Sequence, residues 1–196
     1  MELILGSKSP RRREILNFFS LPFRQIESHF DESLIPFNKP PGPHAQELAE
    51  AKAKMLSATY PKAVCLTADT IVHFQGQSLL KPKNLDEARL MLRKLSNQMH
   101  EVYTGVAITA HGQLFSEAEL TRVFFCELTD SEIDRYIAAF HPFDKAGGYA
   151  IQGAGSMIVK RIEGCYYNVM GLPLQTVRRL LKRAIGVDLW DYFKSV

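Results

Sequence analysis

The chain has 196 residues, of which 46% are hydrophobic and 23% are charged. This balance is typical of a globular protein, and the length suits one domain of ordinary size or a domain with a small lobe; we expect a single domain over residues 1–196. The formal net charge of +3 at pH 7 gives no reason to expect a nucleic-acid polymer or an acidic membrane as partner. The three cysteines are widely separated, and no apolar run has the length of a membrane span or the pattern of a signal peptide. We therefore expect a location in the reducing cytoplasm.

The first stretch of the chain predicts a short strand that runs directly into a helix. Residues 3–5 are apolar, Ser7 lies in the following turn, and Ser9 precedes Pro10 as a natural N-cap. Three arginines then occupy the first helical turn, where the partial positive charge of the helix start disfavours cations. Either neighbouring carboxylates compensate these arginines, or a phosphate group binds against the turn. The second interpretation is preferred.

A proline-rich loop and a long helix come next. Residues 36–43 contain four prolines and predict a loop, either a mobile flap or a stiff connector. The following helix is expected over residues 44–58, with an apolar face formed by Ala45, Leu48, Ala49, Met55 and Leu56. Lys52 falls on that face, where a lysine either extends to the edge or pairs with an anion. Glu50 and Lys54 lie away from it and are expected to be solvated charges whose i, i+4 spacing permits a pair.

An apolar run over residues 64–72 predicts a fully buried strand that contains a single acid, Asp69. Aspartate is rarely buried unless it is paired. It forms either a structural ion pair or a carboxylate that a core strand presents to a site, and the second interpretation is preferred.

The rest of the chain alternates strand and helix patterns, and the last helix carries a basic face that we expect to be solvated. The predicted elements are a hairpin turn at 75–77, a helix over 85–95, strands over 100–110, 114–118 and 121–127, a capped helix over 129–140, a strand over 157–162, and a helix after Pro173. Residues 144–155 are rich in glycine, which permits close approach to a ligand but equally forms turns.

Several polar residues stand in unusual positions and predict one common site. They are Ser7, Arg11, Arg12, Glu32, Lys52, Asp69, Lys81 and Lys145. A polyphosphate held by the cations, with Mg²⁺ or Mn²⁺ bridging it to Asp69 and Glu32, balances these charges, because Mg²⁺ usually takes one or two carboxylates and substrate oxygens. The matching reaction is attack of water on phosphorus, with Asp69 either accepting the proton or holding the metal. The motifs of P-loop proteins, serine hydrolases and zinc proteases are absent.

Motifs along nearly the whole chain resemble those of the Maf family of nucleoside-triphosphate pyrophosphatases. They are Ser7–Arg12, Asp31–Glu32, Ala68–Thr70, Lys81–Pro82, His100–Gly105, Asp144–Gly153 and Asn168–Pro173. The resemblance implies an elongated α/β fold with a mixed, twisted sheet flanked by helices, and two lobes with a central cleft. It also implies a divalent-metal-dependent hydrolase that converts a nucleoside triphosphate to the monophosphate and diphosphate, often as a homodimer.

The resemblance also implies roles for individual residues. Asp69 aligns with the catalytic proton acceptor. The substrate and metal pocket of the family aligns with Ser7, Arg11, Arg12, Glu32, Lys52, Lys81 and Gln152.

The branch of the family is indicated by Arg11, Thr70 and Gln152, which match the dTTP/UTP branch rather than the branch that acts on 7-methyl-GTP. A glutamine amide donates and accepts hydrogen bonds, which suits the imide edge of thymine or uracil. We therefore expect hydrolysis of dTTP and UTP, with modified pyrimidine nucleotides as further candidate substrates. The alternative is a nucleotide-binding regulator of septum formation without significant turnover. A nucleic-acid-binding module is disfavoured by the modest net charge.

Overall fold

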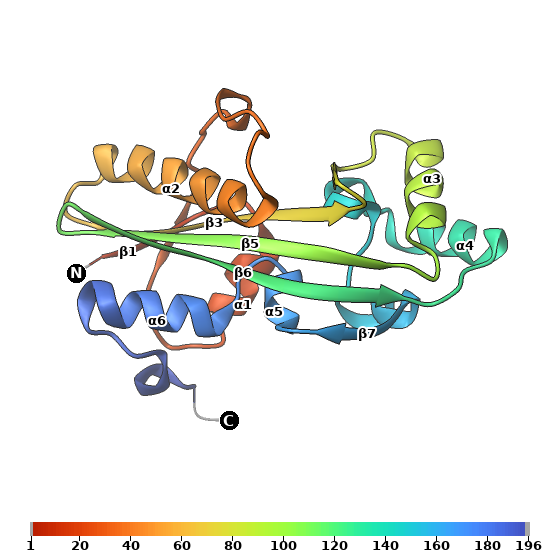
Figure 1. Cartoon of the computed structure of the whole chain (residues 1–196). Coiled ribbons are helices and arrows are strands. Elements are labelled where there is room, and N and C mark those ends of the chain that lie inside the picture. The colour runs from red at the N-terminus through yellow and green to blue at the C-terminus, as the bar shows by residue number, and fades with distance from the viewer. Residues whose placement is uncertain (1, 195–196) are drawn as a thin grey trace. The chain divides into compact units, whose positions relative to one another are not determined.

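The computed structural model describes residues 2–194 and has a mixed α/β fold, which confirms the predicted class (Figure 1). The strands are β1 (Leu3–Gly6), β2 (Arg24–Ile26), β3 (Val64–Phe74), β4 (Gln77–Leu79), β5 (Met99–Ala110), β6 (Gln113–Phe125) and β7 (Val159–Glu163). They form a seven-stranded sheet in the order β2-β1-β3-β5-β6-β7, with β4 paired to β3. Strand β1 is parallel to β2 and β3, whereas β4 and β7 pair antiparallel, so the sheet is mixed.

Six α-helices and five short 3₁₀ segments complete the described part of the chain. The α-helices are α1 (Pro10–Leu16), α2 (Pro41–Thr59), α3 (Leu85–Leu95), α4 (Asp130–Phe140), α5 (Tyr166–Val169) and α6 (Leu174–Ile185). The 3₁₀ segments are η1 (Glu32–Leu34), η2 (Pro142–Asp144), η3 (Ala146–Gly148), η4 (Gly153–Ile158) and η5 (Leu189–Tyr192). Between residues 2 and 194, no helix combines the length and the apolar composition that a bilayer crossing requires.

The chain divides into two compact units. Unit 1 comprises Met1–Asp69, Thr104–Glu119 and Gly171–Val196, and unit 2 comprises Thr70–Tyr103 and Leu120–Met170. Strands β3, β5 and β6 each contribute residues to both units, which explains why the sequence pattern shows no boundary. The expectation of one domain over the whole chain stays a prediction.

Unit 1 is built around β1, whose four residues are all buried between β2 and β3. Helices α2 and α6 cover opposite faces of the sheet in this unit (Figure 1). Helix α2 packs directly on β5 at Gly105, where an added Cβ would lie 2.2 Å from the carbonyl oxygen of Ala45. Glycine is required at this position because no side chain fits between the helix and the strand.

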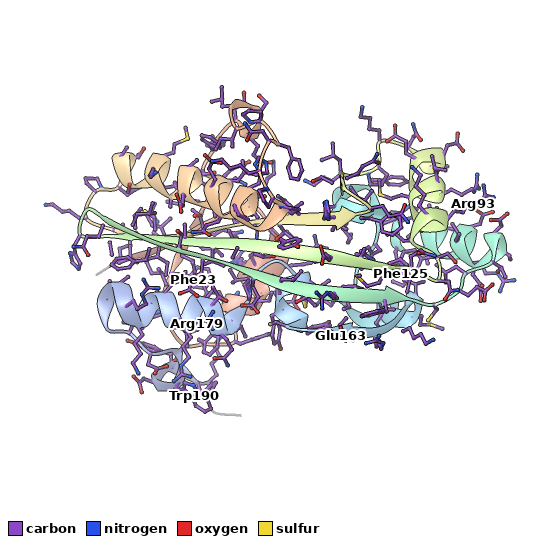
Figure 2. The ribbon with its side chains drawn as sticks, in the orientation of Figure 1. Phe23, Arg93, Phe125, Glu163, Arg179 and Trp190 are labelled. Carbon is purple, nitrogen blue, oxygen red and sulfur yellow. The ribbon has the colours of Figure 1, made fainter. Side chains whose placement is uncertain are left out.

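Unit 2 has its own apolar core, formed where α3 and α4 pack together with residues of β3, β5 and β6. Phe125 ends β6 (Figure 2) and lies edge-on to the rings of His100 and Tyr149, with centroid distances of 5.0 and 4.8 Å. Helix α4 begins at the predicted capping box: Thr129 Oγ1 accepts from the Glu132 amide, and the Glu132 carboxylate accepts from the Thr129 amide.

The structure corrects several predicted element boundaries. Helix α2 begins at Pro41 rather than residue 44. Prolines are tolerated in the first turn because the backbone N–H groups there have no intrahelical hydrogen-bond partner. The predicted strands over 114–118 and 121–127 are joined in one continuous strand, β6, which ends at Phe125. The strand predicted over 157–162 begins at Val159, because the glycine-rich segment before it forms η4. Met55 is 44% exposed, so its predicted place on the apolar face of α2 is wrong.

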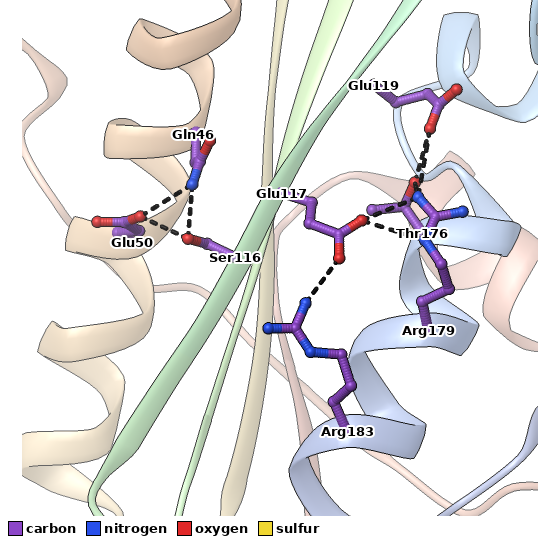
Figure 3. Close-up of polar contacts among 8 residues, drawn as sticks. All are labelled: Gln46, Glu50, Ser116, Glu117, Glu119, Thr176, Arg179 and Arg183. Carbon is purple, nitrogen blue, oxygen red and sulfur yellow. Dashed lines mark hydrogen bonds and ion pairs between the residues drawn. The ribbon is translucent and has the colours of Figure 1, made fainter.

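Strand β6 holds polar side chains on both faces (Figure 3). Toward α2, the Glu50 carboxylate accepts from Ser116 Oγ at 2.5 Å and from Gln46 Nε2 at 3.4 Å. Among the described residues, the Glu50–Lys54 pair that the spacing permits does not form, because Glu50 instead accepts from Ser116 of β6.

Toward α6, the Glu117 carboxylate accepts from Arg179 Nη2 at 2.9 Å and from Arg183 Nη1 at 2.8 Å (Figure 3). Arg178 pairs with Asp188 at 2.6 Å. The arginines of α6 are therefore neutralised within the chain. The side chains of Arg179, Lys182 and Arg183 are more than half exposed, so the prediction of a solvated basic face is confirmed, with surface carboxylates as partners.

Candidate active site

The turn between β1 and α1 is organised by two serines, as the sequence predicts. Ser9 is the N-cap of α1 and its Oγ accepts from the Arg12 amide, with Pro10 at the first helical position. Ser7 Oγ accepts from the Ser9 amide at 3.1 Å and from Arg12 Nη1 at 3.2 Å. Arg12 Nε donates to the Gly171 carbonyl at 2.8 Å. The Arg12 guanidinium is thus fixed beside the Ser7 hydroxyl.

Gln25 supports the same turn from the neighbouring strand β2. Its Nε2 donates to the Ser7 carbonyl at 2.7 Å and to the Ser9 carbonyl at 3.3 Å. Sequence reasoning missed both Gln25 and the Gly171 carbonyl. The only signals were a polar residue in a short strand and a glycine within a motif. Neither signal shows that a backbone atom is the partner.

The central feature of unit 1 is a lysine that bridges two carboxylates. Lys52 Nζ lies 2.5 Å from Asp69 Oδ1 and 2.6 Å from Glu32 Oε1. Lys52 and Asp69 are each 8% exposed, whereas the Glu32 side chain is 58% exposed. Lys52 therefore does not extend to the helix edge. It points inward and pairs with the acid of the buried strand, and this ion pair belongs to a cluster that also contains Glu32.

The electrostatics of this cluster are dominated by burial. Loss of hydration raises the pKa of Asp69, the positive charge of Lys52 opposes that rise, and the negative charge of Glu32 adds to it. Burial also lowers the pKa of Arg12, and the nearby Asp69 carboxylate opposes this effect. Arg11 lies close enough to lower the pKa of Arg12 further. A buried carboxylate with a raised pKa is a better proton acceptor than an exposed one.

The structure therefore brings together the predicted residues that belong to unit 1, and the others belong to unit 2. The first group is Ser7, Arg11, Arg12, Glu32, Lys52 and Asp69, and the second is Thr70, Lys81, Lys145 and Gln152. Within unit 2, Lys145 Nζ lies 2.5 Å from Asp144 Oδ1, Lys81 is exposed after β4, and Gln152 precedes η4. A common site for the two groups stays a prediction.

The acids of unit 1 fit the expected kind of metal ion. Among residues 2–194, no three His, Cys, Asp or Glu side chains are grouped as a metal cage. The carboxylates of Glu32 and Asp69 nevertheless converge on a single cation, the Lys52 ammonium. A pair of carboxylate oxygens suits Mg²⁺ or Mn²⁺ when water and substrate oxygens supply the other ligands. The metal itself stays a prediction.

These residues define a class of site: a buried acid that can accept a proton, beside an arginine, a lysine and a serine that suit an anionic substrate. The comparisons agree with this class. A family model described as Maf-like protein matches residues 2–184, and the chain belongs to the Maf family, as its motifs predict.

Relatives of known name match almost end to end. A protein of Chlamydia caviae is 43% identical over 192 residues, which is 97% of each chain. A protein of Geobacillus sp. is 47% identical, covering 93% of this chain and 97% of its own. A protein of Halalkalibacterium halodurans is 48% identical, covering 92% and 94%. Each of the three is named dTTP/UTP pyrophosphatase.

Proposed function

We propose that this protein is a hydrolase that converts dTTP and UTP to the corresponding monophosphate and diphosphate. The observation that carries the proposal is the buried Asp69, whose pKa is raised by burial and whose carboxylate pairs with Lys52. Full-length relatives named dTTP/UTP pyrophosphatase support the choice of substrates. Modified pyrimidine nucleoside triphosphates are further candidate substrates.

The residues of unit 1 have separate roles in the proposed reaction. Asp69 accepts a proton from the attacking water, whose oxygen bonds to a phosphorus atom flanking the bridge between the α- and β-phosphates. The P–O bond of that bridge breaks, its electron pair stays on the bridging oxygen, and the monophosphate and the diphosphate separate, one of them carrying the oxygen of the water. Arg12, with Ser7 beside it, binds phosphate oxygens and stabilises the charge that develops on them. Glu32 and Asp69 would hold a divalent cation, which polarises phosphate oxygens when bound.

Base selection is assigned to Arg11, Thr70 and Gln152, because these residues match the dTTP/UTP branch of the family. Lys81 and Lys145 are assigned to phosphate binding. The proposal places the enzyme in the cytoplasm, as a homodimer that needs neither a nucleic acid nor a membrane as partner.

The test is release of diphosphate from UTP, dTTP, CTP, GTP and 7-methyl-GTP with Mg²⁺ or Mn²⁺. We expect UTP and dTTP to be preferred, and Asp69→Asn to lower turnover by about 10²- to 10⁴-fold, the usual contribution of a positioned base. Asp86→Asn is the matched control, because Asp86 is a strongly exposed acid on α3.

Each other outcome has a distinct meaning. Preference for 7-methyl-GTP would contradict the assignment to the dTTP/UTP branch but would agree with the proposed type of hydrolysis. Tight binding of UTP without turnover would contradict the proposed enzymatic activity and would favour the alternative, a nucleotide-binding regulator of cell division.

A further inference from the structure

The Lys52 ammonium occupies the place between two carboxylates that a divalent cation would need. Its Nζ is within hydrogen-bond distance of both Asp69 Oδ1, at 2.5 Å, and Glu32 Oε1, at 2.6 Å. The two carboxylate oxygens are therefore at most about 5 Å apart, the sum of the two distances. All three residues belong to unit 1.

Two carboxylates this close require a positive charge between them, because one of them is buried and poorly hydrated. In the described structure the ammonium supplies it. A divalent cation bound to the same two oxygens and the ammonium in its present position exclude one another by volume and by charge repulsion. One positive group must leave before the other enters.

We infer that Lys52 is an internal counter-cation that competes with the divalent metal for Glu32 and Asp69 and moves to the substrate phosphates when the metal is bound. This inference rests on the proposed function, since that function supplies the metal and the triphosphate. Lys52 then has an anionic partner in both states, first the two carboxylates and afterwards the phosphates.

The exchange makes metal and triphosphate binding mutually dependent. Without a triphosphate, the displaced ammonium loses both of its carboxylate partners, so metal binding alone is weakened. With a triphosphate present, the ammonium gains a new partner and the carboxylates are released for the metal. Because coupling between two ligands is reciprocal, metal binding strengthens triphosphate binding by the same factor.

The decisive experiment measures Mn²⁺ binding without nucleotide, from the loss of the free-ion electron paramagnetic resonance signal. Lys52→Met removes the ammonium and keeps an unbranched side chain of similar length. We expect it to bind Mn²⁺ about tenfold or more tightly than the wild type, because a competing charge is removed. Lys54→Met, on the same helix but exposed, is the matched control and should bind Mn²⁺ as the wild type does.

Unchanged or weaker Mn²⁺ binding by a folded Lys52→Met would overturn the inference, since an ordinary phosphate-binding lysine has no reason to oppose the metal. A measurement on the wild type covers the case in which the variant does not fold. Amine acylation, followed by peptide mass spectrometry, should label Lys52 at least several-fold faster when Mn²⁺ is added, with Lys54 as internal reference. An unchanged ratio would overturn the inference.

These readouts separate the inference from the proposed function. If the wild type hydrolyses UTP but neither Mn²⁺ binding by Lys52→Met nor acylation of Lys52 changes as expected, the proposed exchange is wrong and the proposed function is supported. If Lys52→Met binds Mn²⁺ more tightly but the wild type hydrolyses no triphosphate, the competition between Lys52 and the metal is supported and the proposed function is wrong.

Discussion

Lowering the pH from 7.5 to 4.5 is expected to destabilise the protein through one buried imidazole, that of His100. This residue is only 1% exposed. Its Nε2 lies 2.7 Å from the Tyr149 hydroxyl, and the ring meets Phe125 edge-on. Burial lowers the pKa of His100 from 6.5 to about 4. The folded protein therefore holds this imidazole neutral through a pH range in which the unfolded chain protonates it.

The sign and size of the effect follow from proton linkage. Between pH 6.5 and pH 4, the unfolded chain binds more protons at His100 than the folded chain does, so stability falls as the pH falls. The contribution is fully present above the unfolded pKa. A shift of about 2.5 units, at 1.36 kcal/mol per unit, corresponds to about 3 kcal/mol, most of which is lost by pH 4.5.

The assay is urea unfolding of the wild type and His100→Gln, followed by circular dichroism at several pH values. Glutamine does not titrate, so the difference in unfolding free energy between the two proteins should shrink by more than about 2 kcal/mol between pH 7.5 and 4.5. His111→Asn is the control, because His111 is exposed and asparagine tolerates its φ of 51°. Parallel pH profiles for the wild type and His100→Gln would refute the reasoning.

Two further predictions concern packing. Gly105→Ala should cost about 3 kcal/mol in urea unfolding, because its Cβ would collide with the backbone of α2 near Ala45; a cost below about 1 kcal/mol would show that the helix can move away. Asn168→Ala should cost about 1–3 kcal/mol, because Asn168 Nδ2 donates to the Val102 carbonyl and to Thr121 Oγ1, both at 2.9 Å. Asn38→Ala, at an exposed loop position, should change stability by less than about 0.5 kcal/mol, and an equal loss in both variants would contradict the argument.

The sequence predicted the site residues whose charged side chains interrupt an otherwise apolar strand or helix face. Asp69 interrupts an apolar strand and Lys52 interrupts the apolar face of a helix, and the structure pairs the two. The fold class followed from the resemblance of the motifs to those of the Maf family. Gln25 and Gly171 could not be predicted, because they act on Ser7 and Arg12 through hydrogen bonds to backbone atoms, which leave no pattern in the side chains.

The motif His100–Gly105 contains two residues whose roles are structural. His100 packs against Phe125 and Tyr149 in the core of unit 2, and Gly105 allows α2 to pack against β5. Both residues are explained by packing. Sequence similarity alone identifies such a motif without separating structural residues from reactive ones, and burial and hydrogen bonding separate them.

The charges of unit 1 also constrain how the proposed substrate binds. Arg12 and Lys52 supply two positive charges, and Glu32 and Asp69 supply two negative charges, so these four residues carry no net charge. A bare triphosphate is attracted by the cations but repelled by the acids, and the repulsion is strong because Asp69 is buried. A divalent cation held by Glu32 and Asp69, as proposed, would remove this repulsion and would leave both basic side chains available to the phosphates. In the proposed function the acids would therefore make binding selective for the metal-bound form of the nucleotide, which arginines and lysines alone would not do.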